Sequence, residues 1–293
     1  MFARTILWPA LILSFAIPVA QEQKTIVVTV LDKTGGVVKD VAAGDLAVLE
    51  DSATREVIEV KPVTEPLVVA VLVDNTKPTM GKDAPTRELR AGLTALVTTL
   101  HASNPATEIG LWEFAGAGVM IQKPTVKTED LTKRINRMFP SQSTGGVLLE
   151  ALVDASKELS KKPPQLRRAI VSVSFNSPET STMDARECAI AIKKARVTYW
   201  AVSVQGNADA NTSASGGSPV RELIINNVTQ ATGGVRLTAV TAISLEQQLK
   251  SVGDALVSQY LVTYARPSGA SAPANIQAFS KKGLKALTGP WVR

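Results

Sequence analysis

The sequence predicts an α/β protein, with a doubly wound and mainly parallel sheet flanked by helices and a small β satellite formed by the N-terminal and C-terminal segments. Three observations lead to this prediction. Leu67–Val73 is a continuous apolar run rich in valine, as is typical of a strand covered on both faces. Strand and amphipathic helix patterns then alternate up to residue 258. Short β-type segments separated by turns stand at both ends of the chain.

The first twenty residues have the composition of a secretory signal peptide. Arg4 provides a positive charge, and residues 6–19 are almost wholly apolar before a polar run begins at Gln21. The apolar run is short for a membrane span and is interrupted by prolines. We therefore expect an exported protein, periplasmic or extracellular, with no stable membrane span once residues 1–20 are removed.

The rest of the chain has an ordinary globular composition, with 45% hydrophobic and 20% charged residues. Without Arg4, 31 basic residues face 26 acidic ones, and the basic residues are scattered, which argues against a nucleic-acid partner. Cys188 is the single cysteine, so an internal disulfide cannot form. Its Ala-rich helical surroundings indicate a small buried side chain rather than a reactive thiol.

Four segments follow from these patterns. After the signal peptide, residues 21–66 form an N-terminal β region that ends near Pro66, because proline removes a backbone donor and restrains its predecessor. Residues 67–258 form the α/β domain, whose last helix is expected to open with a capping box of Ser244 and Gln247. Residues 259–293 form a β tail that packs on the N-terminal region, since neither end segment has enough strands to be stable alone.

The order of these elements resembles the von Willebrand factor type A domain, and especially a bacterial exported subgroup in which a small β region precedes that domain. Four phrases carry the resemblance: residues 28–36, 45–51, 69–74 and 258–264. Each phrase is weak alone, but their order and spacing together are specific. The resemblance implies a divalent-metal site, the metal-ion-dependent adhesion site, at the carboxyl ends of the strands.

This sequence departs from the metal-site pattern that the resemblance implies. The family's Asp-x-Ser-x-Ser loop corresponds here to Asp74-Asn75-Thr76-Lys77-Pro78, in which proline replaces the second serine. Val147 stands where a threonine follows the Gly-Gly turn, and Phe175 stands where a second aspartate is expected. Because Mg²⁺ requires well-placed oxygen ligands, we expect a degenerate site that binds no metal. Asp74 then has a structural role, such as accepting backbone N–H groups or pairing with Lys77.

The resulting expectation is a non-enzymatic module, without a cofactor, that binds an unidentified protein partner. Ligands of open α/β sheets bind beyond the carboxyl ends of the strands, so the expected contact residues lie in the loops there. They are Asp74, Asn75, Thr76, Lys77, Ser143, Thr144, Phe175 and Asn176. Two alternatives remain open: an adhesion module that binds Mg²⁺ or Ca²⁺ through Asp74 and Thr76, and a remote one, an envelope hydrolase using His101, the single histidine.

Overall fold

The computed structural model describes residues 21–292, except for residues 77–84, 176 and 205–218. The expected signal peptide, residues 1–20, lies outside the described residues, as do the predicted contact residues Lys77 and Asn176. Within the described part, none of the helices combines the length and the apolar character that a membrane crossing requires.

The centre of the molecule is a six-stranded mixed sheet with the strand order β10-β9-β8-β5-β6-β7. All neighbouring strands are parallel except β6 and β7. The strands are β5 (Leu67–Val73), β6 (Glu108–Glu113), β7 (Val119–Thr125), β8 (Arg167–Ser174), β9 (Val197–Val204) and β10 (Arg236–Ala239). The predicted doubly wound α/β fold class is confirmed, and every residue of β5 is buried, as its apolar run predicts.

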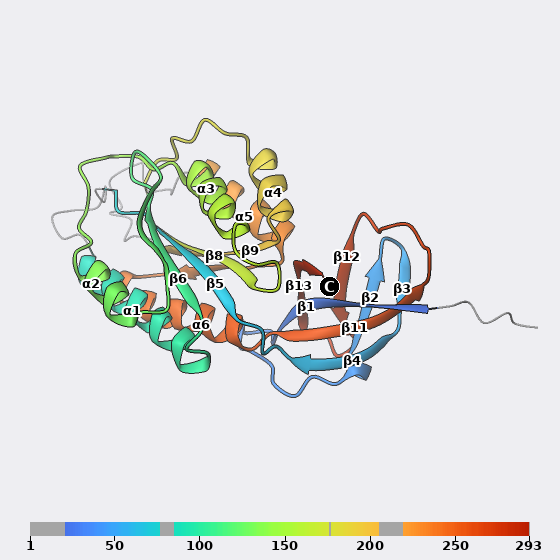
Figure 1. Ribbon diagram of the computed structural model, residues 1–293. Coiled ribbons are helices and arrows are strands. Elements are labelled where there is room, and N and C mark those ends of the chain that lie inside the picture. The colour runs from blue at the N-terminus through green and yellow to red at the C-terminus, as the bar shows by residue number, and fades with distance from the viewer. Residues whose placement is uncertain (1–20, 77–84, 176, 205–218, 293) are drawn as a thin grey trace, which may run out of the picture.

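Helices cover both faces of this sheet (Figure 1). The side chains of Val69, Val71 and Val73 share a core with α1, α2 and α6, whereas the alternate residues Val68 and Ala70 share a core with α3, α4 and α5. The helices are α1 (Thr86–Ser103), α2 (Thr128–Asn136), α3 (Leu148–Ser160), α4 (Ala185–Lys194), α5 (Pro219–Thr232) and α6 (Leu245–Val257). Alternate side chains of β5 thus pack into two separate cores, one on each face of the sheet.

The beginning of α6 differs from the sequence prediction. A short 3-10 turn, η2 (Ala242–Ser244), precedes the helix, and the Ser244 hydroxyl donates a hydrogen bond to the Thr241 carbonyl 2.8 Å away. The Ser244 side chain accepts no capping bond from α6, so the expected capping box with Gln247 is wrong. The preceding 3-10 turn uses the serine hydroxyl that the cap required.

The two ends of the chain form a β satellite, as predicted (Figure 1). One sheet has the order β13-β1-β11-β4, the second has the order β12-β2-β3, and a short 3-10 turn, η1 (Ala43–Asp45), precedes β2. The strands are β1 (Gln21–Leu31), β2 (Leu46–Glu50), β3 (Ala53–Arg55), β4 (Val57–Pro62), β11 (Tyr260–Pro267), β12 (Ile276–Ser280) and β13 (Lys285–Val292). A third core, which includes Ile26, Val48 and Tyr264, lies between the two sheets.

Polar side chains join the satellite to the central sheet. The buried guanidinium of Arg167, at the start of β8, donates to the Leu256 carbonyl at 2.9 Å and to Gln259 Oε1 at 2.5 Å. Gln259 Nε2 in turn donates to the Thr29 hydroxyl of β1 at 2.9 Å. Burial lowers the pKa of Arg167 to about 10, still far above neutral pH. The junction therefore contains a charged group whose donors are satisfied by both parts.

Cys188 allows the core to be tested. It is fully buried in the layer that α3 and α4 form on the sheet, and this burial raises the pKa of its thiol to about 12. In an unfolded chain a cysteine thiol has a pKa of about 8.5. The folded state therefore keeps its full stability below that pH. Above it, the free energy of unfolding falls progressively as the pH rises toward 12, because the thiol can ionise only in the unfolded chain.

We expect the free energy of unfolding of the wild type to fall by about 2 kcal/mol more than that of Cys188→Ala between pH 8 and pH 10. Urea denaturation of both proteins at the two pH values measures this difference. The Ala variant is the control, because it keeps the other titrating groups. Parallel losses of stability in the two proteins would show that the thiol is accessible in the folded state.

Candidate functional site

The candidate site lies where β5, β6 and β8 end at the same edge of the sheet. Asp74 directly follows β5, and its amide donates to the Val173 carbonyl of β8 at 2.9 Å. Phe114 directly follows β6, and its amide donates to the Val73 carbonyl of β5 at 3.1 Å. The first residues after the three strands are therefore held together by the backbone bonds of the sheet.

The Asp74 carboxylate is buried, with 1% of the residue exposed, and both of its oxygens accept several hydrogen bonds. Oδ1 accepts bonds from the Thr76 amide at 3.2 Å and the Thr76 hydroxyl at 2.6 Å. Oδ2 accepts bonds from the Phe175 amide at 3.3 Å and the Ser177 hydroxyl at 2.6 Å, and it forms an ion pair with Arg221. All the acceptor capacity of the carboxylate is thereby used within the chain.

Arg221 brings a positive charge into this edge of the sheet from α5. Its side chain is 3% exposed, and its Nη1 lies 2.7 Å from Asp74 Oδ2. Nε lies 2.7 Å from Glu179 Oε2, in the loop after β8, while Nη2 donates to the Pro178 carbonyl at 3.1 Å. The guanidinium carbon also lies 5.5 Å from the centre of the Phe114 ring. One planar cation therefore contacts the loops after β5, β6 and β8.

Glu179, the second carboxylate of this cluster, also caps a helix. Its Oε1 accepts hydrogen bonds from the Leu148 amide, at the start of α3, and from the Ser181 hydroxyl, at 3.0 and 2.6 Å. A negative charge is favourable at a helix N-terminus, where the backbone N–H groups carry a partial positive charge. The two buried carboxylates are thus balanced by the Arg221 guanidinium and by the beginning of α3.

Gly146 allows the guanidinium to approach. A Cβ atom built at this position would lie 2.9 Å from Arg221 Nη2 and 3.1 Å from the Phe114 carbonyl oxygen. A side chain at this position would have to displace the guanidinium or the Phe114 carbonyl, so the absence of a Cβ favours this close approach. The Gly-Gly turn that the sequence places before α3 therefore makes room for the cation.

The structure places the predicted contact residues at different depths. Asp74 and Thr76 are buried, and Asn75 and Phe175 are partly exposed beside them. Ser143 is partly buried, and its hydroxyl donates to the Gly145 carbonyl at 2.8 Å, while Thr144 is exposed. Surface contact at this edge is therefore available to Asn75, Thr144 and Phe175, whereas Asp74 and Thr76 lie below them.

Three central residues of the cluster were missed by the sequence analysis: Ser177, Glu179 and Arg221. A signal existed for one of them. Arg221 stands three, four and seven residues before Ile224, Ile225 and Val228, the buried apolar side of α5. A charged residue on the apolar stripe of a helix needs a buried partner, and Asp74 was the remaining carboxylate of the implied site.

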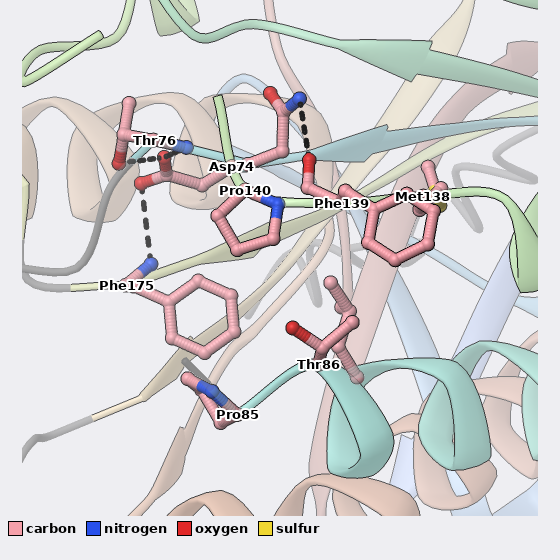
Figure 2. Close-up of a pocket in the computed structure, with 10 residues that line it drawn as sticks. Asp74, Thr76, Pro85, Thr86, Met138, Phe139, Pro140 and Phe175 are labelled. Carbon is pink, nitrogen blue, oxygen red and sulfur yellow. Dashed lines mark hydrogen bonds between the residues drawn. The ribbon is translucent and has the colours of Figure 1, made fainter. Parts of the chain in front are cut away.

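A small cleft opens beside Asp74 (Figure 2). It measures about 310 Å³, including the part open to solvent, and its lining is largely apolar. The apolar lining residues are Pro85, Leu89, Met138, Phe139, Pro140 and Phe175. Phe139 is 65% exposed, and the Arg90 guanidinium lies 4.7 Å from the centre of its ring. Asn75 borders the same cleft, and its side-chain amide lies 3.5 Å from the Phe139 carbonyl.

Glu113, the last residue of β6, is a partly buried carboxyl linked to Asn75. Burial raises the pKa of Glu113, while the positive charge of Arg134 and the hydrogen bond from Asn75 act in the opposite direction. The Asn75 side chain therefore connects the apolar cleft to a carboxyl that is protonated more readily than an exposed glutamate.

No family model and no curated protein sequence matches this chain. Solved structures do match it. Proximal thread matrix protein 1 from the mussel byssus aligns with a TM-score of 0.54 and 15% identity, over 68% of this chain and 50% of that one. A von Willebrand factor type A protein from Catenulispora acidiphila aligns with a TM-score of 0.53 and 8% identity, over 92% and 74%. The chain has the von Willebrand factor type A fold.

A further structure of the mussel protein, with a zinc-occupied MIDAS motif, aligns with a TM-score of 0.52 and 16% identity, over 66% of this chain and 48% of that one. The present chain thus spans about half the length of the mussel protein. In the mussel protein a metal ion is bound at the adhesion-site motif. In this chain, Asp74, which follows β5, is paired with Arg221.

We expect Arg221→Met to destabilise the fold by about 3–5 kcal/mol, because it leaves two buried carboxylates without their cation. Arg236→Met is the matched control: Arg236 pairs with Glu222, whose side chain is 46% exposed, so its loss costs about 1 kcal/mol or less. Chemical denaturation of both variants measures the difference. Equal stabilities would show that the Arg221 ion pairs do not support the loops.

Proposed function

We propose that this chain is an exported, non-enzymatic protein-interaction or scaffold module that binds its partner without a divalent metal. The observation that carries the proposal is the ion pair between Arg221 and Asp74. The chain supplies its own cation, in the form of an arginine, to the aspartate that begins the adhesion-site loop.

Metal-free binding is supported by the chemistry of the cluster. A divalent ion near Asp74 would have to displace hydrogen bonds from Thr76 and Ser177, and it would stand beside the positive charge of Arg221. Mg²⁺ gives up water only for a well-placed set of oxygen ligands. Val147 and Phe175 provide no side-chain oxygen at two positions where the resemblance implies one.

The partner contact is assigned to the apolar cleft and its rim. Phe139 and Phe175 border the cleft from two different loops, near Asp74 (Figure 2). Aromatic side chains next to a pocket are frequent anchors of protein interfaces. The cleft also lies beyond the carboxyl ends of the strands, where open α/β sheets bind their ligands.

A non-enzymatic role agrees with the environments of His101 and Cys188, the single histidine and the single cysteine of the chain. Both ring nitrogens of His101 are engaged, at 2.8 Å from the Thr128 hydroxyl and 3.0 Å from the Thr107 carbonyl. The thiol of Cys188 is buried and held in its neutral form by burial. His101 thus joins the end of α1 to its neighbouring segments, and Cys188 fills the core.

We expect calorimetric titration of the wild type with Mg²⁺, Mn²⁺ and Ca²⁺ to give no saturable heat, because Arg221 already neutralises the site. A thermal melt with millimolar metal serves as the control, since a ligand at about 100 times its dissociation constant would stabilise the fold by about 2.7 kcal/mol. A one-to-one isotherm that disappears in Asp74→Ala would establish the metal-dependent adhesion module instead.

We expect a photo-crosslinking residue placed at Phe139 to capture a discrete protein adduct from the native envelope, to the same extent with and without EDTA. The matched control carries the same residue at Ile190, which is equally exposed, at 65%, but lies on α4. Capture that requires divalent metal would refute the metal-free mode. Equal capture from positions 139 and 190 would refute the assignment of the contact to the cleft.

A further inference from the structure

The apolar cleft has an arginine at its rim. Arg90, on α1, places the carbon of its guanidinium 4.7 Å from the centre of the Phe139 ring, and its Nη2 donates to the Met138 carbonyl at 2.7 Å. Met138 and Phe139 both line the cleft, and Figure 2 shows Phe139 and Phe175 on two sides of it. The Arg90 cation therefore lies against one aromatic wall of the cleft.

The hydrogen-bond donors of Arg90 are only partly used. Its Nε is buried and has no hydrogen-bond partner, and no carboxylate in the described part of the chain forms an ion pair with its guanidinium. A guanidinium keeps its charge and offers five donors in a fixed fork. Buried donors of this kind are normally bonded, so Arg90 is suited to an acceptor from outside the chain.

Two further arginines add positive charge on this side of the cleft. Arg134 stands in the last turn of α2 and Arg137 directly follows the helix, and both residues are exposed. Of the carboxyl groups nearby, Glu88 is paired with Arg87 at 3.1 Å, and Glu113 is partly buried, opposite Arg134. Positive charge is therefore in excess among the described residues of the rim, which favours an acidic partner.

The size of the cleft limits what can enter it. Pockets that hold whole small ligands measure roughly 300–1,000 Å³. This cleft measures about 310 Å³ including the part open to solvent, and its lining is largely apolar. It therefore suits one apolar side chain, and the neighbouring residues of the same segment then lie over the rim, where the arginines stand.

We infer that the cleft selects an acidic segment of a partner protein, in which one apolar side chain enters the cleft and an adjacent carboxylate pairs with Arg90. The inference rests on the proposed contact at the cleft and adds the chemistry of the partner. Charge-assisted bonds from a guanidinium to a carboxylate are among the strong hydrogen bonds of proteins. The apolar anchor provides affinity, and Arg90 provides the preference for acidic sequences.

The test measures fluorescence polarisation of three labelled heptapeptides with blocked ends, in the presence of EDTA. Their central residues are Asp-Leu-Asp, Asn-Leu-Asn and Asp-Ser-Asp, between Gly-Ser and Ser-Gly. We expect saturable binding of the Asp-Leu-Asp probe and about fivefold weaker binding of the Asn-Leu-Asn probe, because the latter lacks the charge for Arg90. The Asp-Ser-Asp probe should not bind, because it lacks the apolar anchor.

The variant Arg90→Gln removes the charge and keeps a side-chain donor for the Met138 carbonyl. It should bind the Asp-Leu-Asp and Asn-Leu-Asn probes equally, at the wild-type affinity for the neutral probe. Arg186→Gln is the matched control: it removes an exposed arginine from the first turn of α4, on the other face of the sheet, and should keep the wild-type preference. Arg90→Lys keeps the charge and should retain part of the preference.

Equal binding of the two leucine probes to the wild type, or a preference that survives in Arg90→Gln, overturns the inference. Absence of binding up to millimolar probe overturns it as well. Sedimentation with phosphatidylglycerol vesicles tests the other acidic surface: vesicle binding that Arg90→Gln abolishes, without a preference among the peptides, assigns the rim to a membrane. Photo-crosslinking at Phe139 reports separately on the proposed function. Capture that Arg90→Gln leaves unchanged keeps the contact at the cleft and removes only its acidic selectivity.

Discussion

The edge of the central sheet depends on one buried guanidinium. Arg221 is bonded at the same time to Asp74, Glu179 and the Pro178 carbonyl, and its plane lies near the Phe114 ring. These partners come from the loops after β5, β6 and β8. A planar cation with five donors suits such a junction, since each donor direction can serve a different loop. The positions of Phe175 and of the cleft beside it follow from this arrangement.

Buried ion pairs often add little net stability, because desolvation offsets their attraction. Their value here is geometric. Asp74 alone accepts bonds from the amides of Thr76 and Phe175 and from the hydroxyls of Thr76 and Ser177, so its position fixes the start of two loops. A metal ion at such an edge can be lost to a chelator, whereas a covalently attached arginine cannot. In the proposed metal-free mode, the order of these loops does not depend on the ionic composition of the surroundings.

The fold class could be predicted from the sequence, because the spacing of apolar residues along strands and helices can be read without knowing any tertiary contact. The apolar run of Leu67–Val73 and the alternation of strands and helices led to the correct fold class, and the rule for strand ends led to Asp74, Asn75, Thr76 and Phe175. The cation was not found: Arg221 lies 147 residues from Asp74, and only its place on the apolar side of α5 pointed to a buried partner. Phe139 was missed for a similar reason: the exposure of one aromatic residue depends on the path of its loop.

The arrangement of the satellite has a consequence for the order of folding. The chain leaves the satellite after β4 and returns to it in β11, and these two strands are hydrogen-bonded neighbours. The whole central domain is thus an insertion between two adjacent strands. β1 cannot pair with β11 until the central domain has been synthesised, because the paired residues Thr25 and Thr263 are 238 residues apart. Closing such a long loop is slow when its interior is disordered. If the central domain folds first, it brings β4 and β11 together. β1 and β13 can then pair onto β11 to complete the four-stranded sheet.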